Sequence, residues 1–118
     1  MNKNEYFGSC HCGEIKFKFY SSESVEIWKC NCSICAPLSY EHLFIKHEDF
    51  KIIQGKKLLS EYFFGTKKAR HLFCKKCGTK SFYQPRSHPD SYSINLKCVQ
   101  NGPEIKNVIH FDGKNEFN

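Results

Sequence analysis

Seven of the eight cysteines fall in three short groups, and their spacing constrains the fold more than any other feature of the sequence. The groups are a C-x-C pair, a C-x-C-x-x-C triad and a C-x-x-C pair, formed by Cys10 and Cys12, by Cys30, Cys32 and Cys35, and by Cys74 and Cys77. A C-x-C pair is poorly suited to two separate disulfides but well suited to chelating a metal ion. The sequence therefore predicts metal sites that hold distant segments together.

The pairs and the triad predict two zinc sites of different character. A closed structural zinc site takes four protein ligands, whereas a catalytic zinc usually takes three and keeps a fourth position for water or substrate. The two pairs supply four thiols, and we expect them to bind a structural zinc ion. The triad supplies three thiols, and we expect it to bind a catalytic zinc ion whose fourth position is open.

Other interpretations of these residues stay open at the level of sequence. The four thiols of the pairs could instead ligate an iron–sulfur cluster or carry out redox chemistry. Cys98 or a histidine could close the triad into a second structural site, although we favour a buried free thiol for Cys98. His11 and His71 lie near the pairs, but the thiols suffice for each ion, so we expect neither to be a ligand. His42 and His88 could line a pocket or lie in solvated loops.

Length and composition favour a small intracellular domain. The 118 residues fit one domain, and we expect residues 1–118 to form a single zinc-binding domain with an aromatic-rich core. The first residues lack the apolar run of a signal peptide, so we expect reduced, metal-bound thiols in the cytoplasm or also in the nucleus. No apolar stretch approaches the ~20 residues that cross a bilayer, so we expect a soluble protein without a membrane partner.

A mild excess of basic residues favours anionic partners. Lysine and arginine number 18 against 12 aspartates and glutamates, which suits a carboxylate-bearing metabolite, a phosphate or nucleic acid. Zinc-bound thiolates would add negative charge, so nucleic acid is the less favoured partner. One basic cluster surrounds the second cysteine pair, and we expect a solvated face there that could also receive a carboxylate or a phosphate; it comprises Lys67, Lys68, Arg70, Lys75, Lys76 and Lys80.

Alternation of apolar and polar residues predicts a β-rich chain. The pattern is clearest where Ile15, Phe17 and Phe19 alternate with charged residues, as in a strand with one buried face. Further strands are expected at residues 25–29, 40–46, 51–53, 58–64, 69–73, 91–96 and 108–111. A helical turn is expected near Ile34, and Pro37 is expected to end the loop of the triad. Residues 113–118 are expected to fray.

The three cysteine motifs, in segments 8–13, 30–35 and 73–78, together resemble those of the glutathione-dependent formaldehyde-activating enzyme family, which also includes centromere protein V. The resemblance spans nearly the whole chain, and segment 80–89 is more similar to the centromere protein V branch. It implies a mainly β fold like that of Mss4, a β-tent of antiparallel sheets stabilised by zinc. It also implies a structural zinc ion on Cys10, Cys12, Cys74 and Cys77 and a catalytic zinc ion on Cys30, Cys32 and Cys35.

The activity that this resemblance implies is that of a carbon–sulfur lyase, which interconverts glutathione plus formaldehyde and S-hydroxymethylglutathione. A zinc ion with an open position would bind the glutathione thiol, lower its pKa and present a thiolate to the carbonyl carbon. Other thiol adducts stay open as substrates. The alternative is a zinc-stabilised binding module without chemistry, which would contact protein or nucleic acid through its basic face.

Overall fold

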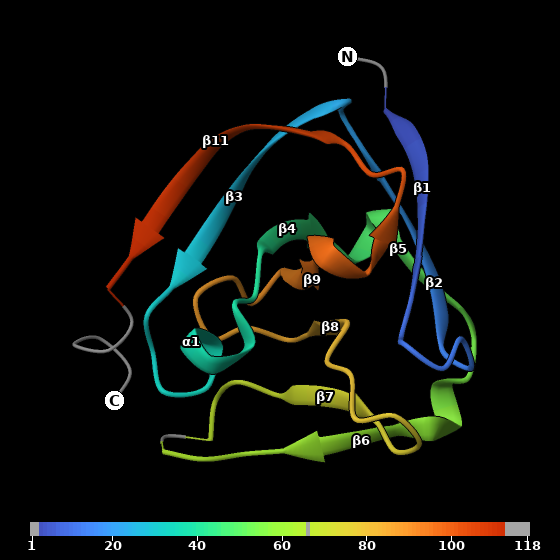
Figure 1. Cartoon of the computed structure of the whole chain (residues 1–118), viewed down its shortest axis with the longest axis vertical. Coiled ribbons are helices and arrows are strands. Elements are labelled where there is room, and N and C mark those ends of the chain that lie inside the picture. The colour runs from blue at the N-terminus through green and yellow to red at the C-terminus, as the bar shows by residue number, and fades with distance from the viewer. Residues whose placement is uncertain (1–2, 66, 113–118) are drawn as a thin grey trace.

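The computed structural model describes residues 3–65 and 67–112, and in this part of the chain eleven strands form three sheets (Figure 1). The first sheet has the order β10 (Val99–Gln100), β1 (Asn4–Ser9), β2 (Lys16–Ser21) and β5 (Phe50–Gln54). The second has the order β11 (Glu104–Phe111), β3 (Ser24–Cys30), β4 (His42–Lys46), β9 (Ser91–Asn95) and β8 (Phe82–Tyr83). The third pairs β6 (Leu59–Tyr62) with β7 (His71–Cys74). The prediction of a mainly β chain is confirmed.

Helices in the described residues are short. They are one α-helix, α1 (Cys35–Leu38), and three 3-10 helices, η1 (His47–Asp49), η2 (Lys56–Leu58) and η3 (Leu96–Cys98). The predicted helical turn near Ile34 is confirmed, but Pro37 lies inside α1 rather than ending the loop. Proline is tolerated there because the first turn of a helix leaves its N–H groups without intrahelical partners. None of these helices has the length and apolar character that a membrane span requires.

The alternation of residues in β2 and β3 places the core where the sequence predicts it. Ile15, Phe17 and Phe19 are fully buried, and so is Ile27 of β3. Phe17 reaches across to Phe82 of β8, with their ring centroids 5.3 Å apart. Because burying a large apolar side chain contributes roughly 1.5–3 kcal/mol, these contacts join the first two sheets strongly.

The strand β9, predicted at residues 91–96, departs from simple apolar–polar alternation. Ile94 is fully buried, yet Ser93 on the other face is fully buried as well. Ser93 is buried because Tyr40 and His42 cover it. Tyr40 donates its hydroxyl proton to the Ser93 carbonyl at 2.7 Å, and His42 Nδ1 lies 2.7 Å from Ser93 Oγ. Period-two patterning fails for a central strand that is covered on both faces.

Three strands lie outside the sequence prediction, β1, β8 and β10, and β11 is longer than predicted. β1 carries no clear alternation of apolar side chains, although it pairs with β2 along its whole length. β11 begins at Glu104, four residues before the predicted strand, and runs parallel to β3, whereas the other strand pairs of the described chain are antiparallel. Figure 1 shows β11 and β3 side by side along one flank of the molecule. The predicted frayed tail, 113–118, lies outside the described residues.

Gly55 fixes the turn after β5 against the loop of the first cysteine pair. Its φ is +84°, and a Cβ atom there would lie only 2.2 Å from the Glu14 carbonyl oxygen. The Gln54 side chain donates a hydrogen bond to the same oxygen at 3.2 Å. Both the left-handed conformation and the close approach of two backbones therefore require glycine here.

Replacing Gly55 with alanine is expected to lower the free energy of unfolding by about 3 kcal/mol or more, because left-handed strain of roughly 1–2 kcal/mol adds to a backbone clash. Gly65→Ala is the matched control, since Gly65 has φ +58° but a Cβ atom there meets nothing within 4 Å. Denaturant titration of both variants checks the prediction, and equal losses of stability would contradict it.

Candidate functional site

The structure brings the two cysteine pairs together, although 62 residues separate Cys12 from Cys74. We call this group the four-thiol cluster; it comprises Cys10, Cys12, Cys74 and Cys77, whose Sγ atoms lie within 4.8 Å of one another. Cys12 Sγ lies 3.5 Å from Cys10 Sγ and 3.7 Å from Cys74 Sγ. A tetrahedral zinc ion with bonds of ~2.3 Å separates its sulfur ligands by roughly 3.8 Å. The four-thiol cluster therefore fits a zinc ion.

The two turns that carry the four-thiol cluster are built in the same way. The backbone N–H groups of Ile15 and Lys76 each donate to the sulfur of the first cysteine of their pair at 3.4 Å. Gly13 and Gly78 follow the second cysteine of each pair with φ +79° and +77°, a left-handed conformation that glycine adopts without strain. The Thr79 hydroxyl, 3.4 Å from Cys77 Sγ, lowers the pKa of that thiol to about 5. Hydrogen bonds to sulfur favour the thiolates that a metal ion requires.

The triad forms a second group, the three-thiol cluster, which comprises Cys30, Cys32 and Cys35 with their Sγ atoms within 4.8 Å of one another. Cys30 ends β3 and Cys35 begins α1, so two elements fix the loop between them. The backbone N–H of Cys35 donates to Cys32 Sγ at 3.4 Å. Within the described residues, no fourth cysteine, histidine or carboxylate joins the cluster and none of the three thiols is in a disulfide. A zinc ion held by these thiols has room for a further ligand.

The three thiols compete for negative charge. Hydrogen bonds from Cys30 and then Cys35 lower the pKa of Cys32 to about 2. The contact with Cys32 raises the pKa of Cys30, and the contacts with Cys30 and then Cys32 raise the pKa of Cys35, since a second thiolate would lie beside the first. All three can be ionised together only when a cation neutralises them, so binding of a divalent ion here releases protons.

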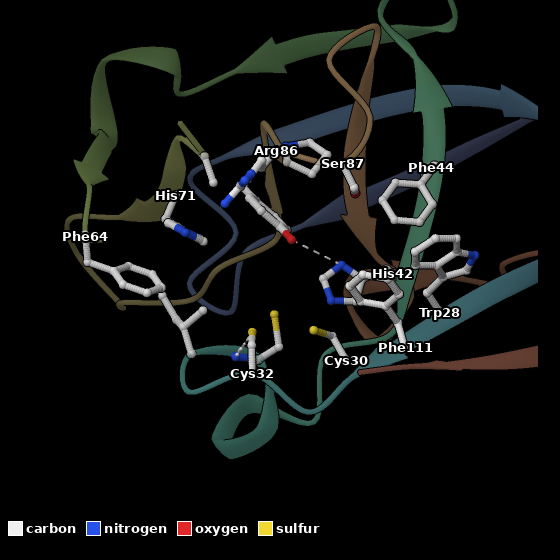
Figure 2. A pocket seen from close by; sticks show the side chains of 15 residues that line it. Trp28, Cys30, Cys32, His42, Phe44, Phe64, His71, Arg86, Ser87 and Phe111 are labelled. Carbon is white, nitrogen blue, oxygen red and sulfur yellow. Dashed lines mark hydrogen bonds between the residues drawn. The ribbon is translucent and has the colours of Figure 1, made fainter. Parts of the chain in front are cut away.

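A pocket opens onto the three-thiol cluster (Figure 2) and holds about 660 Å³ of space, part of it open to solvent. We call it the aromatic pocket because rings dominate its wall, those of Trp28, Phe44, Phe64, Tyr83 and Phe111. Trp28 stacks on Phe111 with ring centroids 5.0 Å apart and meets Phe44 edge-on at 5.2 Å. Arg86 and Ser87 also line this pocket, and no carboxylate does so among the described residues. The wall is preformed and largely apolar.

A second hollow shares Cys30, Cys35 and Phe111 with the aromatic pocket, and most of its other lining residues have polar or charged side chains. We call it the polar groove; its polar lining residues are Lys29, Asn31, Ser39, His110 and Asp112. The Asn31 side-chain amide donates to Asp112 Oδ1 at 3.0 Å. The three-thiol cluster thus borders two hollows, and among the described residues only the polar groove is lined by a carboxylate.

His42 is the histidine best placed for chemistry. It lies on β4, is 3% exposed and lines the aromatic pocket (Figure 2). Burial, with a smaller contribution from the charge of Lys80, lowers its pKa to about 3, so the ring is neutral at pH 7. Its Nδ1 lies 2.7 Å from Ser93 Oγ and 3.4 Å from the Tyr83 hydroxyl, whereas its Nε2 is buried without a hydrogen-bond partner among the described residues.

Lys80 corrects the expectation of a solvated basic face around the second cysteine pair. It is only 7% exposed, donates from Nζ to His71 Nδ1 at 2.7 Å and lies 3.7 Å from the centroid of the Tyr83 ring. Burial lowers the pKa of Lys80 to about 8, while the charges of the three-thiol cluster oppose this shift. Among the described residues no carboxylate forms an ion pair with Lys80, whereas Arg70 pairs with Glu61. Lys80 is therefore a buried cation that faces thiolates.

The other cysteine and histidines considered in the sequence analysis lie outside both clusters or pack against aromatic rings. Cys98 is a free thiol outside both clusters, and burial, followed by the charges of Cys10 and Cys77, raises its pKa to about 11. His11 is exposed and belongs to neither cluster, as expected. His88 stacks on Phe44 at 3.7 Å behind the pocket wall. Sequence reasoning missed the roles of Lys80 and Tyr83, because nothing in their local pattern distinguishes them from surface and core residues.

Replacing Cys74 with serine is expected to lower the zinc content by one ion per chain and to unfold most of the protein, because structural zinc contributes on the order of 10 kcal/mol to folding. Cys98→Ser is the matched control and should keep its zinc content and most of its stability, since Cys98 lies outside both clusters. Metal analysis and circular dichroism check both variants. A folded Cys74→Ser protein with unchanged zinc would contradict the assignment.

Comparison with known proteins agrees with this geometry. The family model of the glutathione-dependent formaldehyde-activating enzyme matches residues 5–113. A crystal structure of a Rhodobacter sphaeroides protein is similar, with 29% sequence identity and a TM-score of 0.73, and the match covers 80% of this chain and 88% of that chain. The predicted Mss4-like fold of antiparallel β-sheets is accordingly confirmed. With its match over nearly the whole sequence, this chain belongs to the glutathione-dependent formaldehyde-activating enzyme family.

Proposed function

We propose that this protein is a zinc-dependent carbon–sulfur lyase that interconverts glutathione plus formaldehyde and S-hydroxymethylglutathione. The observation that carries the proposal is the three-thiol cluster, which borders a pocket and has no fourth protein ligand among the described residues. Membership of the family supports glutathione and formaldehyde as substrates. In this proposal the protein acts as one domain with two zinc ions, one structural on the four-thiol cluster and one catalytic on Cys30, Cys32 and Cys35.

The chemistry needs an activated thiol and an acceptor for charge. A zinc ion in the three-thiol cluster would lower the pKa of a bound substrate thiol, so that a thiolate is available at neutral pH. The thiolate sulfur attacks the carbonyl carbon, a C–S bond forms, and the electron pair of the C=O π bond moves to oxygen. That oxygen takes up one proton, which balances the proton lost by the thiol. The aromatic wall of the pocket keeps bulk water away and strengthens each electrostatic contact.

His42 is suited to stabilise the developing alkoxide. The hydroxyl groups of Ser93 and Tyr83 both face Nδ1 and can donate to it, which leaves the proton of the neutral ring on Nε2. A buried N–H without a partner is costly, so the alkoxide would supply an acceptor that the protein lacks at this position. A neutral donor of this kind stabilises charge that appears only during the reaction.

The alternative, a zinc-stabilised binding module that contacts nucleic acid or protein through a basic face, has less support. Lys80 is buried, and two other members of the predicted basic cluster are in ion pairs, Arg70 with Glu61 and Lys76 with Glu14. The closer similarity to the centromere protein V branch and the cytoplasmic or nuclear location stay predictions from the sequence.

Exchange NMR spectroscopy of formaldehyde with glutathione tests the lyase directly. Wild-type protein is expected to accelerate the exchange, and Cys32→Ser is expected to return it to the uncatalysed rate with one zinc ion lost per chain. Cys98→Ser serves as the control for a thiol outside the clusters and should retain the wild-type rate. Equal rates for wild type and a folded Cys32→Ser variant would remove the proposal.

Replacing His42 with phenylalanine is expected to slow the catalysed exchange about 10²-fold, because it keeps a ring of similar size but removes the donor. The zinc content should stay at two ions per chain. His47→Phe makes the same substitution at an exposed histidine outside the pocket lining and should have little effect. A loss of zinc in His42→Phe would instead identify His42 as a metal ligand.

A further inference from the structure

The two hollows beside the three-thiol cluster differ in what they can bind. Glutathione carries two carboxylates and an ammonium group, which need polar or charged partners when they leave water. The polar groove offers Lys29 and Asp112, one residue of each charge, next to Cys30 and Cys35. The aromatic pocket is lined by the cationic Arg86 and by no carboxylate among the described residues, so an ammonium group there would meet a like charge. Charge complementarity therefore directs the peptide to the polar groove.

The aromatic pocket also has more room than formaldehyde requires. Formaldehyde has two non-hydrogen atoms, whereas the space that water-sized groups can occupy in the pocket measures about 60 Å³, and one such group takes roughly 10–15 Å³. Five rings wall this space together with Ile34, Ala69 and Pro85, and an apolar wall binds apolar groups by burying their surface. The contacts of Trp28 with Phe44 and Phe111 keep the wall open in the absence of a ligand.

We propose that the aromatic pocket binds the apolar side chain of a larger aldehyde, so that the protein acts on hemithioacetals of glutathione with branched or aromatic aldehydes. The inference rests on the proposed function, because it keeps the same thiol, the same cluster and the same reaction. The thiolate sulfur adds to the aldehyde carbon, the C–S bond forms, the π electrons move to oxygen, and that oxygen takes the proton that the thiol released. Nothing is oxidised or reduced, and the reverse step returns the free aldehyde.

The chain offers a matched pair of variants, because its two alanines line different hollows. Ala69 lines the aromatic pocket, and Ala36 lines the polar groove. Ala69→Leu fills part of the space assigned to the aldehyde side chain. Ala36→Leu fills part of the space assigned to the peptide and lies on an exposed face of α1.

Exchange NMR spectroscopy with acetaldehyde and 3-methylbutanal tests the proposal, each rate being divided by its uncatalysed rate. Each buried methylene is worth roughly a factor of four in binding, so wild type should favour 3-methylbutanal by at least about tenfold in kcat/KM. Ala69→Leu should reduce this preference to about one, whereas Ala36→Leu should keep it and raise the KM for glutathione. The proposal is overturned if wild type shows no preference, or if Ala69→Leu raises the KM for glutathione instead.

A second readout does not depend on turnover. Trp28 is the single tryptophan of the chain and lines the aromatic pocket, so its fluorescence reports on occupancy. The unreactive alcohol 3-methylbutan-1-ol should change the emission of wild type but not of Ala69→Leu, and glycerol should change neither. Emission that is unaltered by the alcohol overturns the pocket assignment. Wild type that binds the alcohol but does not accelerate formaldehyde exchange contradicts the proposed function and leaves an apolar-ligand site.

Discussion

The attraction between thiolates and a cation is the interaction on which this structure depends. Seven thiols lie in two clusters, and in the three-thiol cluster the contacts among the sulfurs lower the pKa of Cys32 but raise the pKa of Cys30 and of Cys35. A divalent ion removes this conflict, because it binds all the sulfurs as thiolates. In the four-thiol cluster the same interaction would join segments that are far apart in the sequence, because the cluster brings the loop after β1 next to the turn after β7. The sheets themselves are small, and a metal ion bound by the four-thiol cluster would cross-link these distant segments.

Charge around the three-thiol cluster is balanced by a residue that looks ordinary in the sequence. Three thiolates and one zinc ion carry a net charge of minus one, and Lys80 brings one buried positive charge beside them. The hydrogen bond from Lys80 to His71 and the close approach to the Tyr83 ring hold this charge in place. His42 and His71 are both neutral in this setting, because burial and the charge of Lys80 lower their pKa values to about 3 and about 4. The pocket therefore has two neutral histidines in its wall besides the charged Arg86, and the buried cation Lys80 lies against one of them, His71.

Much of this architecture could be predicted from the sequence, because cysteine spacing and apolar alternation are local signals. The cysteine groups indicate which thiols belong together, and the alternation around Phe17 indicates which face of β2 is buried. The prediction fails where the cause is tertiary. Ser93 is buried only because Tyr40 and His42 cover it, and β11 is held as a strand by its partner β3 rather than by its own exposed residues. Likewise, no local pattern distinguishes the buried Lys80 from its solvated neighbours.

Because β11 pairs in parallel with β3, the two cysteine clusters can form one after the other while the chain is being synthesised. All ligands of the four-thiol cluster have been made once the ribosome has passed Cys77. The loop of the three-thiol cluster, although it is made earlier, is braced by the Phe111 carbonyl, which accepts from the Asn31 backbone N–H at 3.3 Å, and by Asp112, which is 81 residues from Asn31. A nascent chain can thus bring the four thiols of its scaffold together before the three-thiol cluster takes its final shape.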